Sequence, residues 1–169
     1  ITWFENNLGR LFKMKLGNEY GWWNMVTPFD ADGDGDIDVL AGNLGLNSRL
    51  KADKEHPVKL YYNDFDGNGR KETILTYFHD GFERPFANKF ELEKQLPVLK
   101  KKFLYAENFA KATLEELFSA EKLKSSIVHH ADHFATTLYI NEGKGKFRPI
   151  IMDSPLQWSP CRAASIIDI

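Results

Sequence analysis

The sequence is poor in cysteine, in net charge and in long apolar runs, and each shortage excludes a class of protein. The single cysteine, Cys161, has no partner for a disulfide within the chain, so the fold is not a disulfide-stapled scaffold. A formal net charge of −2 supplies no strong basic field for a nucleic acid. No run of about 18 apolar residues exists, so nothing in the sequence predicts a membrane span. With 169 residues, of which 43 % are hydrophobic and 27 % charged, the composition is that of a globular protein.

One acidic segment, D-A-D-G-D-G-D-I-D at 30–38, departs from this ordinary composition. Its five alternating carboxylates repel one another, so a cation must offset their charge. Closely spaced oxygen ligands are those that Ca²⁺ selects, whereas Mg²⁺ rarely uses cages made only of protein groups. The ligands expected at loop positions one, three, five, seven (through its backbone carbonyl) and nine are Asp30, Asp32, Asp34, Asp36 and Asp38. Gly35, at position six, allows the sharp turn that such a loop needs.

The pattern recurs at 64–72 as D-F-D-G-N-G-R-K-E. The same five positions hold Asp64, Asp66, Asn68, Arg70 (through its backbone carbonyl) and Glu72. Two polar turns between strands are the alternative, because Asp, Asn and Gly dominate turns, but a turn does not need a nine-residue ligand pattern. We therefore predict two Ca²⁺ sites. The first loop has more carboxylates at ligand positions, so it is expected to bind Ca²⁺ more tightly.

An EF-hand is the main alternative interpretation of such loops, and the sequence departs from the EF-hand pattern in two ways. Position twelve of an EF-hand is Glu, but Ala41 and Leu75 stand there. An EF-hand loop also lies between helices, whereas the exits at 37–42 and 73–78 are rich in β-branched, aromatic and other apolar residues. Each loop is therefore expected to join one strand to the next.

This order of strand, D-x-D-x-D-G-x-x-D loop and strand resembles the FG-GAP and VCBS repeats of integrin-α-like β-propellers. The segment L-Y-I-N-E-G-K-G-K-F at 138–147 resembles the hairpin of that repeat, and W-F-E-N-N-L-G-R-L-F at 3–12 resembles a degenerate copy. The segments at 41–48 and 95–97 also look like those of repeat proteins from Bacteroidetes-type bacteria. The resemblance covers roughly residues 1–80 and 134–169, and it implies a propeller with structural Ca²⁺ but no particular reaction.

The expected fold is mainly β: about two blades of a β-propeller, with calcium-binding loops between strands and a small helical insertion. We expect one partial propeller region over residues 1–169, with repeats at about 1–87 and 125–169 and the insertion at 88–124. A closed propeller needs at least four blades, so the remaining blades would come from a longer chain or a partner copy. Both ends look cut, because the chain begins in a strand-like repeat and Asp168 could open a third loop.

The helical insertion is predicted from apolar residues that recur every three or four positions between Phe90 and Phe103. Pro97 is expected to divide it into two helices, and Leu104 to Lys111 to continue helically. Thr113 and Glu116 have the spacing of a capping box that opens a further helix. The basic cluster Lys100–Lys102 is interpreted as a solvated helix face or as a site for an anionic ligand.

Two further groups of residues could carry chemistry. Strand character is expected at 127–128 and again at 134–140. Three histidines between these segments, His129, His130 and His133, could hold Zn²⁺, but a strand would place His130 on the opposite face from the other two. Exposed or core histidines are the commoner case. In the expected strand over 22–29, Trp22 and Trp23 would point to opposite faces, so one could pack between blades and the other could stack on a sugar.

Two function classes remain open. The first is a non-catalytic module of an exported or cell-surface bacterial protein that binds a protein or a glycan; its location would be extracellular, periplasmic or at the cell surface, where Ca²⁺ fills weak loops. The alternative is part of a calcium-dependent polysaccharide-degrading enzyme of the lyase type. The nearest grouping of residues that a lyase could use is Tyr77, His79 and Arg84. A deep groove that holds such residues would favour the enzyme.

Overall fold

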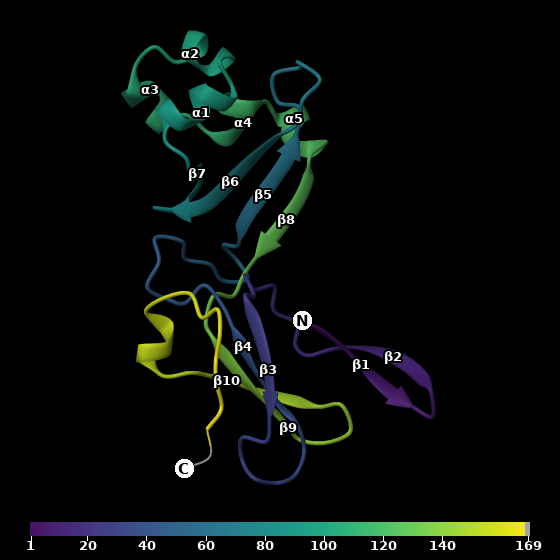
Figure 1. Cartoon of the computed structure of the whole chain (residues 1–169). Coiled ribbons are helices and arrows are strands. Elements are labelled where there is room, and N and C mark those ends of the chain that lie inside the picture. Colours follow the sequence, from purple (N-terminus) through teal and green to yellow (C-terminus); the bar gives the residue numbers. More distant parts are fainter. Residues whose placement is uncertain (168–169) are drawn as a thin grey trace. The chain divides into compact units, whose positions relative to one another are not determined.

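The computed structural model describes residues 1–167 and is mainly β, as the sequence predicts (Figure 1). Ten strands in three sheets and five short helices make up the described part. The chain forms two compact units, one from Ile1–Arg49 with Asp132–Ile169 and the other from Leu50–Ala131. We call them the split unit and the inserted unit, because the second interrupts the first in sequence.

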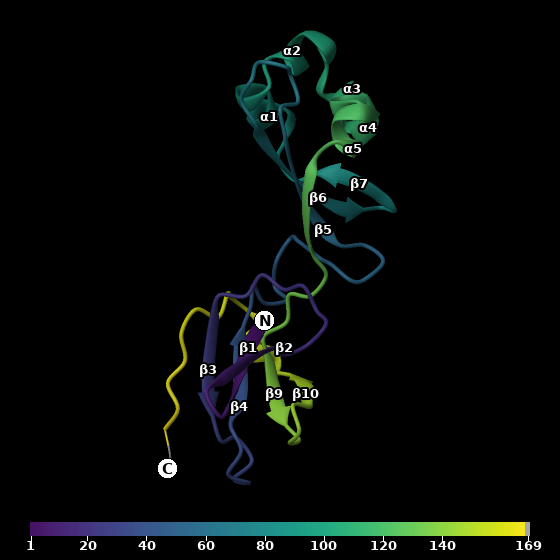
Figure 2. The same cartoon turned by 90° about the vertical axis from the view of Figure 1, so that its right-hand side faces the viewer.

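The split unit contains an antiparallel hairpin and a four-stranded antiparallel sheet, whose strands lie in the order β10-β9-β4-β3 (Figure 2). The hairpin strands are β1 (Thr2–Asn7) and β2 (Arg10–Lys15). The sheet strands are β3 (Met25–Phe29), β4 (Asp38–Gly42), β9 (Thr137–Asn141) and β10 (Phe147–Ile151), and a 3₁₀ turn, η1 (Ser154–Gln157), follows. The β4–β9 pair joins segments on either side of the inserted unit.

The core of the split unit forms around Tyr139, which is buried with Leu16 and Ala41. Trp3 packs edge-on against Phe147, with ring centroids 5.7 Å apart, and so joins the hairpin to the sheet. β3 is an edge strand, which explains why it tolerates a proline that cannot donate to a ladder.

The inserted unit places helices against a second four-stranded antiparallel sheet of order β7-β6-β5-β8. Its strands are β5 (Val58–Asn63), β6 (Glu72–His79), β7 (Phe82–Pro85) and β8 (Ile127–Ala131). Its helices are α1 (Lys89–Gln95), α2 (Val98–Lys102), α3 (Ala106–Lys111), α4 (Leu114–Phe118) and α5 (Ala120–Lys124). The shared core contains Phe65, Ile74, Leu92, Leu96, Leu99, Ala112, Leu114, Leu117 and Phe118.

Local signals determine where these helices begin and end. Pro97 separates α1 from α2, and the predicted capping box of Thr113 and Glu116 opens α4. A second capping box, between Asn88 and Glu91, opens α1. The sequence did not predict that one, although its spacing is the same.

Three expected boundaries are wrong. The strand expected from Trp22 begins only at Met25, because the preceding segment turns to meet His133 through Gly21. The strand expected from Phe134 begins at Thr137, since the carbonyls of residues 133 and 135 accept from an Asn43 side chain instead of a neighbouring strand. The helix expected from Leu104 begins at residue 106.

The described residues contain no helix that is both long and apolar enough to cross a membrane. The third loop expected at Asp168 lies outside the described residues. The three sheets do not form a closed propeller within residues 1–167, and the number of blades stays a prediction.

Candidate metal centre

Both acidic loops join strand to strand, which confirms the prediction and differs from an EF-hand. The first connects β3 to β4, and the second connects β5 to β6. Each pair of strands is antiparallel, so each loop closes a hairpin and brings its first and ninth residues together.

In the first loop the Asp30 carboxylate organises the turn. Its Oδ1 accepts a hydrogen bond from the Gly33 N–H at 2.8 Å, and its Oδ2 accepts one from the Gly35 N–H at 3.0 Å. The loop is closed by the Ala31 N–H, which donates to Asp38 Oδ2 at 2.8 Å. Residues at positions one and nine therefore hold the backbone of the residues between them.

The second loop repeats these contacts position by position. Asp64 Oδ1 accepts from the Gly67 N–H at 2.7 Å, and Asp64 Oδ2 accepts from the Gly69 N–H at 3.0 Å. The Phe65 N–H donates to Glu72 Oε2 at 3.0 Å. The two loops thus share one local structure, although their sequences differ at five of nine positions.

Glycines at positions four and six make this structure accessible. Their φ angles are +79° at Gly33, +90° at Gly35, +77° at Gly67 and +85° at Gly69. Side chains rarely adopt such left-handed backbone angles, so glycine is the residue that fits. A role for position six was predictable from the calcium-loop pattern; position four was not predicted, although the D-G step that both loops share there could have indicated it.

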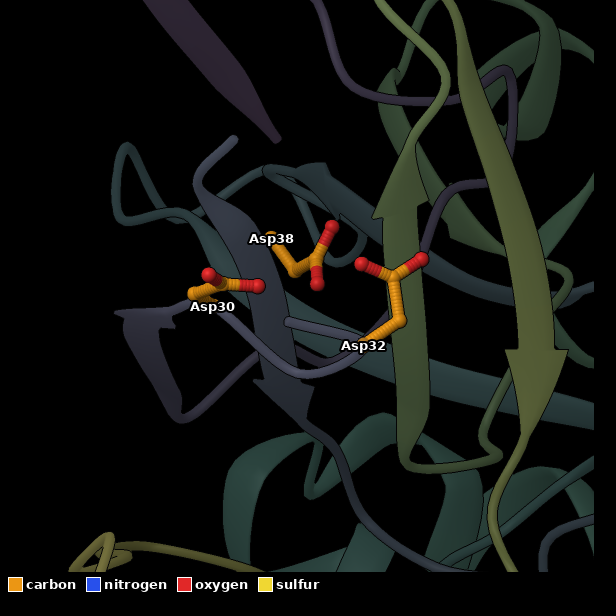
Figure 3. A group of neighbouring side chains, drawn as sticks. All are labelled: Asp30, Asp32 and Asp38. Carbon is orange, nitrogen blue, oxygen red and sulfur yellow. The ribbon is translucent and has the colours of Figure 1, made fainter. Parts of the chain in front are cut away.

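Each loop gathers three carboxylates. In the first loop these are Asp30, Asp32 and Asp38 (Figure 3), whose ligand oxygens lie within 4.8 Å of one another. Those of Asp64, Asp66 and Glu72 form an equivalent group. Two oxygens on opposite sides of a Ca²⁺ ion, each at about 2.4 Å, are about 4.8 Å apart. The oxygen-only donor set and its spacing therefore fit a hard divalent cation.

The other predicted ligands are at positions five and seven of each loop. Asp34 Oδ1 accepts from the Asp36 N–H at 2.8 Å, and Asn68 Oδ1 accepts from the Arg70 N–H at 2.8 Å. Positions five and seven are therefore linked in the same way in both loops. The geometry brings together positions one, three and nine of each loop.

The first loop is attached to the β9–β10 hairpin, a contact that sequence reasoning missed. Asp38 is fully buried, and its Oδ1 accepts from the Asn141 N–H at 2.7 Å. The Asn141 side chain donates to the Ile37 carbonyl at 3.3 Å and accepts from the Gly143 N–H at 3.0 Å. The asparagine in L-Y-I-N-E-G thus holds the loop and its own turn at once.

The second loop is attached to α5 instead. The Lys122 ammonium donates to the Asp64 carbonyl at 2.5 Å, and the Asn63 amide donates to the Lys122 carbonyl at 2.7 Å. The pKa of Asp64 is held below its ordinary value mainly by the hydrogen bond from the Gly69 backbone, with the Lys122 charge as a further contribution. A fixed positive charge beside this loop disfavours a cation there, relative to the first loop.

The histidines are not among the metal-capable groups found in the described residues. His129 and His130 lie on β8. A ring nitrogen of His133 lies 2.9 Å from the Thr137 hydroxyl, and its ring packs 5.6 Å from that of Trp23. These contacts are those of a structural histidine.

The residues considered for a lyase have structural partners too. Arg84 donates to the carbonyls of Ala110 and Ala112, each at 2.9 Å, and so fastens β7 to the end of α3. The rings of Tyr77 and His79 stack with centroids 6.0 Å apart. A hollow between β7 and the helices includes Arg84 in its lining, but neither of these two rings.

Comparison with known proteins yields no match to a family model, to a curated protein or to a solved structure.

Proposed function

We propose that both acidic loops bind Ca²⁺ and that the ions stabilise their hairpins. One observation carries the proposal: two loops of different sequence adopt the same hydrogen-bonded structure, and each brings three carboxylates within 4.8 Å. Like charges at that distance repel, and this repulsion opposes folding unless a cation balances it. When bound, the ion supplies charge neutralisation and a link between the ends of the loop, so its binding free energy adds to folding.

The wider proposal is a calcium-stabilised β module, non-catalytic, in an exported or cell-surface bacterial protein that binds a protein or a glycan. The resemblance of both loops and of the 138–147 hairpin to FG-GAP and VCBS repeats supports it. The hydrogen bond between Asp38 and the Asn141 N–H gives it structural support, because it joins the two segments that carry the resemblance. The remaining propeller blades would be its nearest partners.

Calorimetric titration of chelator-treated protein with CaCl₂ tests the metal proposal. Asp32→Asn and Asp66→Asn each remove one charge, while the amide oxygen can still accept the hydrogen bond that each carboxylate now accepts. We expect two sites in the unaltered chain and a loss of affinity of roughly tenfold or more at one site in each variant. Asp80→Asn, in an exposed turn outside both loops, is the matched control and should bind as the unaltered chain does.

The relative calcium affinities of the two loops provide a second test. Asp38→Ala is expected to lose more calcium affinity than Glu72→Ala, because the first loop has more acidic ligand positions and because Lys122 places a positive charge at the backbone of the second loop. Absence of binding at millimolar Ca²⁺ would refute the proposal. Retention of both sites in Asp32→Asn or in Asp66→Asn would refute the assignment of that loop.

A further inference from the structure

A groove in the split unit is separate from the acidic loops. It is open to solvent, has a volume of about 570 Å³ and is lined by Leu46, Asn47, Met152, Ser154, Gln157 and Trp158. That volume is typical of small-ligand sites. The groove residues Leu46 and Asn47 follow the end of β4, whereas the first acidic loop ends at Asp38, the first residue of that strand, so the strand separates the two features.

Trp158 supplies an aromatic platform at this groove. The residue is 63 % exposed, yet its ring is held in place, because Nε1 donates to Ser154 Oγ at 3.0 Å. Tryptophan is usually well buried, so a tryptophan that is exposed and also oriented indicates a binding surface.

The walls of the groove are joined by backbone hydrogen bonds. The N–H groups of Leu46 and Asn47 donate to the Gln157 carbonyl at 2.8 and 3.1 Å, and the Asn47 amide donates to the Trp158 carbonyl at 3.3 Å. The two backbone segments approach each other closely, because a Cβ added to Gly45 would lie 2.7 Å from the Gln157 carbonyl oxygen. The loop after β4 and the η1 turn therefore form one frame.

A buried glutamine anchors this frame to the sheet. Gln157 is 5 % exposed, and its Oε1 accepts from the Thr136 N–H at 2.9 Å. Its Nε2 donates to the carbonyls of Thr136 and Met152 at 2.9 and 3.0 Å. Because the side-chain amide is used within the protein, the groove is preformed, and a ligand would not have to order it.

The chemistry of the lining selects the ligand class. None of the six lining side chains is ionisable, so no charge in the ligand finds a partner there. The indole face, Leu46 and Met152 suit a flat apolar surface. The Ser154 hydroxyl, which accepts from the indole, keeps its own proton to donate, and the Asn47 amide keeps an oxygen and a second N–H.

We propose that this groove binds a neutral sugar ring of a glycan, stacked on Trp158. A pyranose presents a face of C–H groups, which the negative face of an aromatic ring attracts, and a rim of hydroxyl groups, which suit Ser154 and Asn47. The inference rests on the proposed binding function and deepens it by naming the ligand class and the place. An apolar peptide side chain would use the platform but not the polar rim.

Isothermal titration calorimetry of the calcium-loaded chain with neutral hexasaccharides tests the proposal. The hexasaccharides are those of β-1,4-linked glucose, mannose, xylose and galactose. Polygalacturonate is the charged comparison, and a leucine-rich peptide is the apolar comparison. We expect at least one neutral hexasaccharide to bind in the micromolar to millimolar range, and neither comparison to bind more tightly.

Variants then locate the site. Trp158→Ala should weaken binding roughly tenfold or more, and Trp158→Phe should retain part of it. Ser154→Ala, which frees the indole N–H but keeps the ring, should weaken binding several-fold. Phe12→Ala, on a hairpin side chain of similar size that is also exposed, is the control and should have no effect. Melting curves establish that each variant is folded.

Three results would overturn the inference: no neutral hexasaccharide binds at about 10 mM, binding is unchanged in both Trp158→Ala and Ser154→Ala, or the peptide binds best. A calcium titration of the same sample separates the two proposals. Two calcium sites without sugar binding would refute only the groove. Sugar binding that depends on Trp158, in a chain without calcium sites, would refute only the metal proposal.

Discussion

The Asn141 N–H donates to Asp38 Oδ1 at 2.7 Å, across 103 residues of sequence. Asp38 Oδ2 accepts from the Ala31 N–H at the same time, so one buried carboxylate satisfies donors from the loop and from the β9–β10 hairpin. The residue predicted to close a calcium cage therefore also connects two parts of a sheet.

This arrangement predicts a stability cost that does not depend on calcium. Asp38→Ala leaves the Ala31 and Asn141 N–H groups, whose hydrogen bonds are partly buried, without their acceptor, so we expect a total cost of about 1–3 kcal/mol. The measurement is urea unfolding in excess chelator, followed by tryptophan fluorescence, because all four tryptophans belong to the split unit. Glu72→Ala is the matched change in the other loop. It should leave this transition unchanged, and an equal shift in both variants would contradict the prediction.

Gly35 offers a test of the loop backbone itself. A Cβ at this residue meets no atom within 4 Å, so any cost of Gly35→Ala comes from its φ of +90°. We expect a destabilisation of about 1–2 kcal/mol, and a smaller loss for Gly35→Asn, because asparagine adopts the left-handed region more readily. The same fluorescence-detected unfolding measures both. Asparagine behaving no better than alanine would refute the backbone explanation.

Glu83 organises the sheet of the inserted unit. Its carboxylate accepts from the Thr76 hydroxyl at 2.6 Å, the Lys59 ammonium at 2.7 Å and the Tyr61 hydroxyl at 3.1 Å. Glu83→Ala leaves these donors without that acceptor and should cost about 1–3 kcal/mol. Circular dichroism at 222 nm follows this unit, because all five α-helices belong to it.

The control for Glu83→Ala is Glu107→Ala, which breaks an exposed ion pair with Lys111 in the same unit. Such pairs contribute little, so the control should shift stability by no more than about 0.5 kcal/mol. Glu83→Gln keeps an acceptor oxygen and should fall between the two. If the alanine variants at the two sites were equally stable, the partly buried Glu83 network would contribute no more to stability than an exposed ion pair.

Two tyrosines are expected to ionise last on alkaline titration. Burial, and then the charge of Glu83, raises the pKa of Tyr61 above its ordinary value of 10.0. Burial and Glu19 raise the pKa of Tyr139 in the same way. Both folded-state pKa values exceed the unfolded ones, so the stability they contribute is complete below pH 10 and is lost as pH rises toward them.

Absorbance at 295 nm checks this expectation. Of the six tyrosines, Tyr61 and Tyr139 should ionise only as their units unfold. Tyr61→Phe should remove one late-titrating group and make the 222 nm signal less sensitive to high pH. If Tyr61 and Tyr139 ionised near pH 10 in the folded chain, the prediction would be wrong.

The acidic loops show which contacts can be predicted from residues that are close together in the sequence. Asp30 and Asp64 bond to backbone groups three and five residues later, and positions two and nine bond across seven residues. Such contacts depend on nearby residue types and on glycines with positive φ, so the nonapeptide pattern is enough to predict them. Helix boundaries at Pro97 and Thr113 were predictable for the same reason.

What the sequence determined by itself is therefore local: strand–loop–strand hairpins, the positions that gather carboxylates, and a helical segment within a mainly β chain. The tertiary structure alone decided that β4 pairs with β9 across the inserted unit, that Asn141 supports the first loop, and that the groove beside Trp158 exists. Those contacts join residues about 90 or more positions apart. Their free energy depends on the path of the chain and on burial, which no nearby pattern of residues encodes.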